Sequence, residues 1–297
     1  KQTLYRTSGD SPFIPNLIRA AESGKQVAVL VELRARFDEA RNIEWARKLE
    51  DAGVHVAYGV VGLKTHTKTS LVIRQEGAQI RSYAHVGTGN YNSKTARLYE
   101  DLGLFTCDPG ITGDLINLFN YMTGRSRQMD YQKLLVAPVA MKNRFLELIE
   151  REVLLHTKER PGHIIAKMNQ LEDRSMTEAL YAAAQKGVRV DLIIRGFCCL
   201  RPGVEGFSEN IRVVSLIGRF LEHSRIVCFG AGHDMPSANC KVYLSSADWM
   251  PRNLHRRVEL FIPVENLTVK KQIVEQVMVA NRNDIAQSWE MQPNGSF

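Results

Sequence analysis

A histidine and a lysine two residues apart, His66 and Lys68, stand at the head of an apolar run at residues 71–73. Side chains two residues apart in a strand point to the same face, so we expect this pair to share one face. A neutral imidazole can attack phosphorus, and an ammonium beside it offsets the charge that gathers on phosphoryl oxygens. The pair therefore suits phosphoryl transfer, although a solvent-facing strand edge shows the same pattern.

The pattern returns later in the chain. His223 and Arg225 again place an imidazole two residues before a cation, 157 residues after the first histidine. A short apolar segment begins twelve residues before each histidine, at residues 54–56 and at residues 211–213. A repeat of this length indicates two similar halves, each giving one histidine and one cation to a shared cleft.

A polar turn follows each pair. Residues 87–92 form a glycine-rich turn in the first half, and residues 245–248, with Asn253 beyond them, take its place in the second. Glycines tolerate positive φ and leave room for phosphate oxygens, so backbone N–H groups and the Asn90 amide can approach an anion there. His85 ends the strand before this turn, where it either faces the same cleft or packs structurally.

The elements that position these residues follow an α/β pattern. Helical and apolar strand-length runs alternate in the first half and return in the same order in the second, at residues 11–21, 27–31, 42–51, 54–58, 175–184 and 188–194. Arg36 and Arg195 come shortly after buried strands, and ligands of open α/β sheets collect beyond the carboxyl ends of such strands. We predict two tandem α/β domains.

We place the domain boundary by periodicity, giving domains at residues 1–131 and 132–297. The opening strand and helix of the second domain, residues 132–162, have no counterpart in the first. We therefore expect the first domain to be incomplete at its N-terminus and the natural protein to extend upstream by at least a strand and a helix.

Composition narrows the class of protein. Hydrophobic residues make up 44% and charged residues 24%, as in ordinary globular domains, and no stretch approaches the ~18 apolar residues of a membrane span. The net charge of +7 favours an anionic partner. Five cysteines without a C-x-x-C pair indicate neither a disulfide framework nor a zinc site, and no signal-peptide pattern is present, so we expect a cytoplasmic protein.

Taken together, the ordered motifs resemble the C-terminal catalytic half of the bacterial polyphosphate kinase family, whose two domains share the phospholipase D architecture. The resemblance covers nearly everything up to about residue 265, through the motifs at residues 4–6, 31–39, 62–68, 85–99, 221–223 and 243–249. The last segment, residues 270–297, carries no motif that we can interpret.

The resemblance implies reversible transfer of the terminal phosphate of ATP to polyphosphate through a phosphohistidine. It implies that His66 is the phosphorylated histidine and that His223 serves proton transfer or phosphate contact. It matches Tyr99 and Arg195 to nucleotide-contacting positions. Together with Lys68, His85, Asn90 and Arg225, these are the residues that we expect to bind nucleotide or phosphate. Arg6 and Arg36 match positions associated with Mg²⁺; because a guanidinium cannot ligate a cation, we expect them to hold the phosphates that carry the metal.

The sequence departs from the phospholipase D pattern at one position. The acid expected five residues after the lysine is Ile73 in the first half and Gly230 in the second. Without carboxylates to support the histidines, hydrolysis of lipid is less expected. The alternatives are a phospholipase D-type phosphodiesterase or nuclease with a histidine nucleophile, and a basic scaffold that binds polyanions.

The resemblance also sets the expected partners. These are ATP or ADP and inorganic polyphosphate rather than nucleic acid, in a homo-oligomer, with peripheral contact to the inner face of the membrane left open. Activity of this chain alone is a separate question, because an upstream region would carry contacts to the adenine base.

Overall fold

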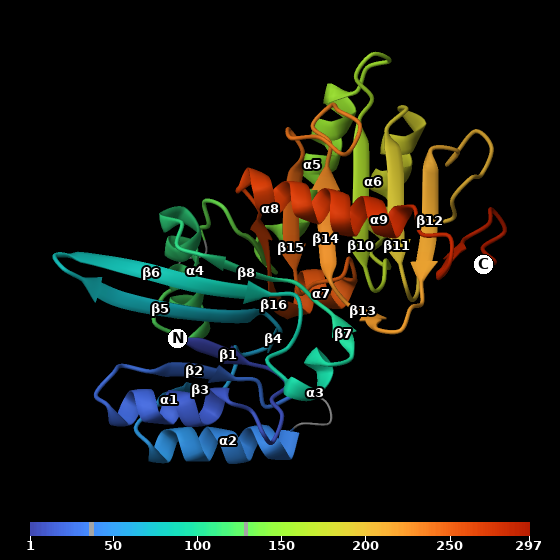
Figure 1. Ribbon diagram of the computed structural model, residues 1–297. Helices are drawn as coiled ribbons and strands as arrows, with labels where there is room; N and C mark the ends of the chain where they lie inside the picture. Colours follow the sequence, from blue (N-terminus) through green and yellow to red (C-terminus); the bar gives the residue numbers. More distant parts are fainter. Residues whose placement is uncertain (36–38, 128–129) are drawn as a thin grey trace.

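The computed structural model describes residues 1–35, 39–127 and 130–297, which fold into two helix-covered β-sheets that lie side by side (Figure 1). In the described residues the first sheet has the strand order β3-β2-β1-β5-β6-β8. β1, β2 and β3 are parallel to one another, and β5, β6 and β8 continue the sheet in antiparallel fashion. The bounds are β1 Gln2–Leu4, β2 Ala28–Val31, β3 His55–Ala57, β5 Lys68–Glu76, β6 Gln79–Gly87 and β8 Gly103–Thr106.

Two sets of helices cover this sheet. α1 (Phe13–Glu22) and α2 (Glu39–Asp51) bury Ile14 and Leu49 against the parallel strands. α4 (Pro109–Met122) packs on one face of the β5–β6 hairpin. It begins where the Asp108 carboxylate accepts the N–H of Ile111, and a proline at the first helical position is compatible with that start.

The second sheet repeats the first. Its order in the described residues is β17-β12-β11-β10-β14-β15-β16-β4, with β9 also paired to β16. The run β12-β11-β10-β14-β15-β16 reproduces the order and directions of β3-β2-β1-β5-β6-β8. The bounds are β9 Leu135–Ala137, β10 His163–Met168, β11 Arg189–Ile194, β12 Ile211–Leu216, β14 Arg225–Phe229, β15 Lys241–Ser245, β16 Arg257–Pro263 and β17 Ser288–Glu290. The predicted tandem α/β halves are confirmed.

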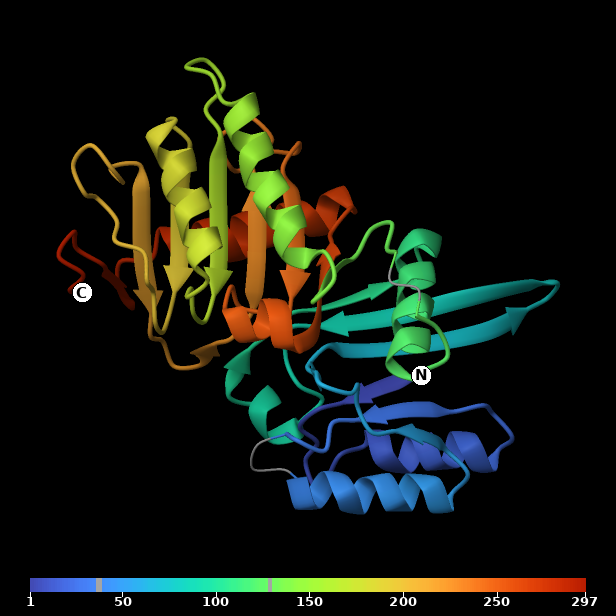
Figure 2. The same cartoon turned by 180° about the vertical axis from the view of Figure 1, so that it is seen from behind.

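Helices lie on both faces of the second sheet. α5 (Met141–Leu155) and α6 (Arg174–Gln185) cover one face, seen in Figure 2, and the last helical segment crosses the other face, seen in Figure 1. That segment runs through α8 (Leu267–Gln272), the π-helical η1 (Ile273–Val279) and α9 (Ala280–Arg282). This segment occupies the place that α4 occupies in the first half. It lies largely within residues 270–297, which carry no interpretable motif, so that part of the chain helps to complete the core of the second half. No helix in the described part of the chain is long and apolar enough to cross a bilayer.

The two halves are joined by short strand pairings that cross between them. β4 (Lys64–Thr65) leaves the first half to pair with β16, and β7 (Tyr99–Glu100) pairs with β13 (Leu221–Glu222). The domain boundary at residues 131 and 132 stays a prediction. In the described residues nothing pairs with the outer edge of β8, the place that β9 occupies beside β16.

Candidate active site

His66 lies in a break between two strands rather than inside one strand. β4 ends at Thr65 in the second sheet and β5 begins at Lys68 in the first, so the strand predicted through this stretch is interrupted. The backbone N–H groups of His66 and Thr67 both donate to the carbonyl oxygen of Val258, at 2.9 and 3.2 Å. The histidine is therefore fixed where the chain passes from one half to the other.

A carboxylate of the second half contacts this imidazole. Nδ1 of His66 lies 2.8 Å from Oε1 of Glu259, a contact bent away from the linear geometry of a strong hydrogen bond. The Glu259 side chain is fully buried, and that of His66 is 12% exposed. Ser246 Oγ donates to the other carboxylate oxygen, Oε2, at 2.5 Å. The ring of Tyr5 meets the imidazole edge-on, with 4.6 Å between ring centroids.

The protonation of His66 follows from burial and from this contact. Burial lowers the pKa of His66 and outweighs the opposite influence of Glu259, so the imidazole is neutral near pH 7. Burial alone would raise the pKa of Glu259, but the neighbouring His66 and Lys68 hold it below its usual range, so the carboxylate is ionised. The proton then sits on Nδ1, facing the carboxylate, and Nε2 keeps a lone pair. Nε2 has no hydrogen-bond partner among the residues that the structure describes.

Lys68 begins β5 two residues after His66, and its side chain turns back toward the backbone of that histidine. Its Nζ donates to the carbonyl oxygen of His66 and lies 5.2 Å from the ring centroid of Tyr5. The side chain is almost completely buried, and burial lowers the pKa of Lys68 below its usual range. Burial lowers the pKa of His223, and Arg225 and Lys68 both lower it further, so Lys68 lies within electrostatic range of the second pair.

His223 is held by the same kinds of contact as His66, but its partners belong to the first half. Its N–H and that of Ser224 donate to the carbonyl oxygen of Glu100, at 3.1 and 3.0 Å. Its Nδ1 lies 2.8 Å from Oδ1 of Asp101, which also accepts a hydrogen bond from Thr88 Oγ1 at 2.6 Å. Each histidine is thus held by a backbone carbonyl and by the next residue's carboxylate from the other half, and a hydroxyl holds that carboxylate.

The inference that the supporting carboxylates are missing is wrong. Ile73 lies half-exposed on the β5–β6 hairpin and Gly230 follows β14, and neither position supports a histidine. The acids come instead from across the interface, as Asp101 and Glu259. The sequence does carry a signal for them, because these two acids stand 158 residues apart, nearly the separation of the two histidines.

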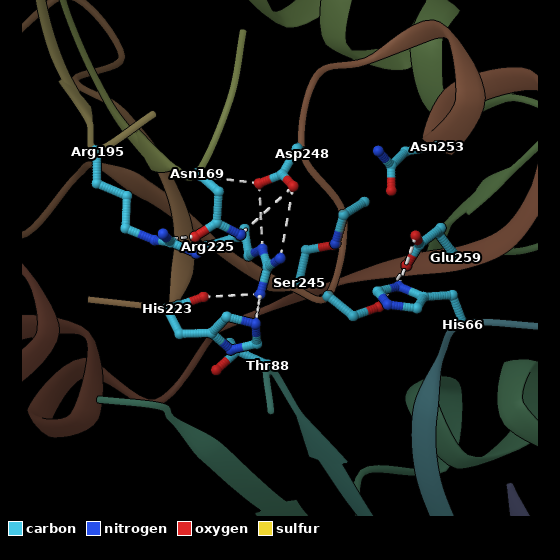
Figure 3. Close-up of polar contacts among 12 residues, drawn as sticks. His66, Thr88, Asn169, Arg195, His223, Arg225, Ser245, Asp248, Asn253 and Glu259 are labelled. Carbon is cyan, nitrogen blue, oxygen red and sulfur yellow. Dashed lines mark hydrogen bonds and ion pairs between the residues drawn. The ribbon is translucent and has the colours of Figure 1, made fainter. Parts of the chain in front are cut away.

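Arg225 makes a denser set of contacts than Lys68. Its Nη1 donates to the carbonyl oxygen of His223 at 2.7 Å and to Nε2 of the same ring at 3.0 Å (Figure 3). Its Nε and Nη2 lie 3.2 and 3.4 Å from the two carboxylate oxygens of Asp248. The backbone N–H of Asn169 donates to Asp248 at 2.8 Å, and the Asn169 side-chain oxygen accepts from Arg195 Nε at 2.6 Å.

Arg195 and Tyr99 complete this side of the cluster. The ring of Tyr99 lies 4.8 Å from that of His223, centroid to centroid. Burial, followed by the repulsion of Arg225, lowers the pKa of Arg195, while Asp248 and Tyr99 act in the opposite direction. Sequence reasoning did not find Tyr5, Asp101, Asn169 or Glu259, which also belong to this cluster.

The remaining predicted residues are His85, Asn90, Arg6 and Arg36. The His85 imidazole contacts Tyr91, whose hydroxyl lies 2.8 Å from Nδ1, and Phe105. Asn90 Oδ1 is buried without a hydrogen-bond partner in the described chain, which leaves an acceptor beside the turn. Arg6 lies over the Tyr5 ring, with Cζ 5.7 Å from the centroid. Arg36 lies outside the described residues.

The fold and the site together define a class of protein: two tandem α/β halves with the same strand order, in which each half contributes one histidine that contacts a carboxylate of the other half. The crystal structure of a phosphatidylserine synthase from Haemophilus influenzae shares the fold, with a TM-score of 0.61 over 98% of this chain and 82% of that one, at 11% sequence identity.

Closer relatives give the family. Residues 1–128 match the family described as polyphosphate kinase C-terminal domain 1, and residues 134–297 match polyphosphate kinase C-terminal domain 2. The polyphosphate kinase of Synechocystis sp. is 61% identical over all 297 residues. The crystal structure of polyphosphate kinase from Porphyromonas gingivalis superposes with a TM-score of 0.88 over 99% of this chain, at 37% identity. The chain belongs to the polyphosphate kinase family and spans 40% of the Synechocystis protein and 44% of the crystallised one.

Proposed function

We propose that this chain carries the phosphoryl-transfer site of a polyphosphate kinase, which moves the terminal phosphate of ATP to and from inorganic polyphosphate through a phosphohistidine at His66. The state of His66 supports the proposal most directly: the ring is neutral, its Nδ1 faces Glu259 and its Nε2 lone pair has no partner among the described residues. The names of its relatives support the reaction class.

The proposed step balances within the site. The Nε2 lone pair of His66 attacks the γ-phosphorus, the N–P bond forms, and the bond from phosphorus to the bridging oxygen breaks so that ADP leaves with that electron pair. Because Nδ1 keeps its proton, the phosphorylated ring gains positive charge, which the Glu259 carboxylate at 2.8 Å stabilises. A terminal oxygen of polyphosphate then attacks the same phosphorus, and His66 returns to its neutral state.

The cations of the cluster suit the charge that develops. A phosphoryl group in a loose transition state spreads negative charge over three oxygens. Burial lowers the pKa of Lys68, and Arg225 lies close enough to lower it further. We assign nucleotide contact to Tyr99 and Arg195, which stand on the His223 side of the cluster.

Mg²⁺ fits this site as an ion coordinated by the nucleotide phosphates rather than by protein side chains. The described residues hold no group of three or more His, Cys, Asp or Glu side chains placed to bind a metal. The carboxylates of Asp101 and Glu259 are engaged by the histidines. A magnesium ion carried by the nucleotide would reduce the charge of its phosphates, and in this proposal Arg6 and Arg36 hold those phosphates.

Labelling with γ-³²P-ATP and Mg²⁺ tests the assignment, on this chain and on the full-length polypeptide of its gene. We expect an acid-labile, base-stable label that His66→Ala abolishes, while His55→Ala, which removes an exposed histidine of β3, leaves it unchanged. His223→Ala should keep the label but block its transfer to polyphosphate. A His66→Ala protein that labels like the wild type would refute the proposal.

A second candidate is a phosphodiesterase or nuclease with a histidine nucleophile. It is favoured by the carboxylate beside each histidine, since the argument against hydrolysis rested on their absence. This candidate predicts cleavage of phospholipid or DNA without nucleotide. A polyanion scaffold would instead bind polyphosphate in a salt-dependent way that survives loss of both histidines.

A further inference from the structure

The two halves differ at the cation that follows each histidine. In the first half, the Lys68 ammonium donates to the carbonyl oxygen of His66, which is its one hydrogen bond in the described chain. In the second half, one nitrogen of the Arg225 guanidinium reaches both the carbonyl oxygen and Nε2 of His223, at 2.7 and 3.0 Å. The two sites are nearly symmetric, but they differ at Nε2 of the histidine: in His223 this atom accepts a hydrogen bond from the neighbouring cation, and in His66 it does not.

This difference decides which lone pair is free. A guanidinium only donates, so Nε2 of His223 must be the acceptor of the Arg225 hydrogen bond. The Nδ1 proton of His223 is directed at Asp101, so the Nε2 lone pair is the ring's single nucleophilic position, and it is occupied. Solvent exposure does not distinguish the two imidazole rings, because the side chains of His66 and His223 are each 12% exposed.

The guanidinium is held in this position by a second buried contact. Asp248 accepts from Nε and Nη2 of Arg225, and Asn169 in turn holds the carboxylate. Both partners are at most 9% exposed. At the position 158 residues earlier, the first half has Asn90, which is uncharged, so the pair Arg225 and Asp248 replaces Lys68 and Asn90.

We propose that Arg225, anchored by Asp248, blocks Nε2 of His223 and thereby assigns the phosphoryl-carrying role to His66. The role of nucleophile in this chain is then set by a lysine-to-arginine difference between the halves. The inference rests on the proposed function for its biological meaning, but the blocked lone pair is a property of the free protein.

The expected gain of function has a balanced chemistry. With lysine at position 225, Nε2 of His223 can attack phosphorus as His66 does: the N–P bond forms, the bond to the leaving group breaks, and that group departs with the electron pair. The Nδ1 proton stays directed at Asp101, which stabilises the charged phosphorylated ring. Potassium phosphoramidate, a small phosphoryl donor that releases ammonia, allows this to be tested without nucleotide.

The first test uses the wild-type protein, so it does not depend on the folding of a variant. Diethyl pyrocarbonate and phosphoramidate modify free imidazole lone pairs, and modified histidines are located by mass spectrometry. We expect His66 to react at least tenfold faster than His223. Equal rates for the two rings would overturn the inference, whether or not ATP labels the protein.

The second test restores the lone pair. Arg225→Lys is combined with Asp248→Asn, which recreates the residue pair of the first half and avoids leaving a buried carboxylate without its partner. In a His66→Ala background, we expect this change to raise phosphoramidate labelling of His223 at least tenfold, and a further His223→Ala change to remove it. A folded double variant, verified by circular dichroism, whose His223 stays unreactive would refute the proposal.

These tests separate this inference from the proposed function. Failure of ATP to label wild-type His66, together with the expected reactivity difference, would reject the phosphohistidine mechanism and keep the role of Arg225. The reciprocal change Lys68→Arg should lower the reactivity of His66 toward phosphoramidate, because a guanidinium there would reach its Nε2. No decrease in a folded Lys68→Arg protein would count against the inference.

Discussion

Each histidine contacts a carboxylate of the other half, and replacing Glu259 by glutamine tests what this contact does for His66. The change keeps the size of the side chain and an oxygen that can accept from Ser246, but it removes the charge 2.8 Å from Nδ1 of His66. A glutamine amide that turns its NH₂ group toward Nδ1 requires that nitrogen to be an acceptor. The imidazole proton then moves to Nε2, and the lone pair that attacks phosphorus in the proposed mechanism is lost.

The size of the effect follows from comparable changes. An asparagine in place of the aspartate of a Ser-His-Asp triad, which also reverses the histidine tautomer, lowers kcat about 10⁴-fold. Loss of an outer partner of a functional histidine costs about 10- to 100-fold. Glu259 is fully buried, so solvent cannot replace it, yet its contact with His66 is bent. We therefore expect phosphohistidine formation to slow by about 10² to 10⁴, or roughly 3–5 kcal/mol.

The assay is rapid-mix labelling of Glu259→Gln with γ-³²P-ATP, in single turnover and corrected for the folded fraction measured by thermal unfolding. Asp101→Asn is the matched control, because it makes the same change beside the other histidine. We expect it to label at a rate within about tenfold of the wild type and to fail mainly in transfer to polyphosphate. Labelling of Glu259→Gln within threefold of the wild-type rate would refute the role given to this carboxylate.

Three further predictions concern the groups around the two histidines. Tyr5→Ala should slow labelling of His66 about tenfold and Tyr5→Phe less than about twofold, since the ring and not the hydroxyl meets the imidazole. Burial would raise the pKa of Asp101, but contacts with His223 and the Thr88 hydrogen bond hold it below its usual value. Thr88→Val should therefore shift the acidic limb of the pH–rate profile of polyphosphate synthesis to higher pH, and Thr88→Ser should restore it. Because burial lowers the pKa of His66, the unfolded chain binds the extra proton below about pH 6.5. In urea titrations, the unfolding free energy of the wild type should fall between pH 7 and pH 5. In His66→Gln this fall should be smaller, by up to about 2 kcal/mol.

The sequence was sufficient for the repeat and for the paired histidines. Spacing within each half is a local property, and the topology of both sheets preserves it: Lys68 pairs with Gly87 across β5 and β6, and Arg225 pairs with Ser245 across β14 and β15. The order of helices and strands also follows from alternating periodicity, because each element buries one face against its own half.

The supporting carboxylates could not be found by the same reasoning. The motif directs attention to a position five residues after the cation, whereas Asp101 and Glu259 reach the histidines through strand pairings between the halves. Nothing in local periodicity shows that β4 pairs with β16. Applying the repeat offset to every acidic residue would have singled out these two.

The break at His66 also escapes a periodicity argument. An apolar run beginning near Lys68 predicts one continuous strand, but two successive N–H groups, from His66 and Thr67, bond to a single carbonyl, that of Val258. A ladder of a regular strand cannot supply that pattern, because its successive N–H groups point to opposite sides. The irregular backbone is what aims the imidazole at Glu259.

The crossed contacts constrain how a substrate can reach the site. Separating the halves would break, at the same time, the N–H bonds of both histidines to Val258 and Glu100 and both imidazole contacts with carboxylates. Each histidine would then lose the group that sets its tautomer, so an opened interface holds no oriented nucleophile. Under the proposed function, a polyphosphate chain therefore enters with the β4–β16 and β7–β13 pairings intact. Movement of side chains such as Tyr99, rather than of whole domains, is the change that the geometry permits, because Asp248 holds Arg225 in place.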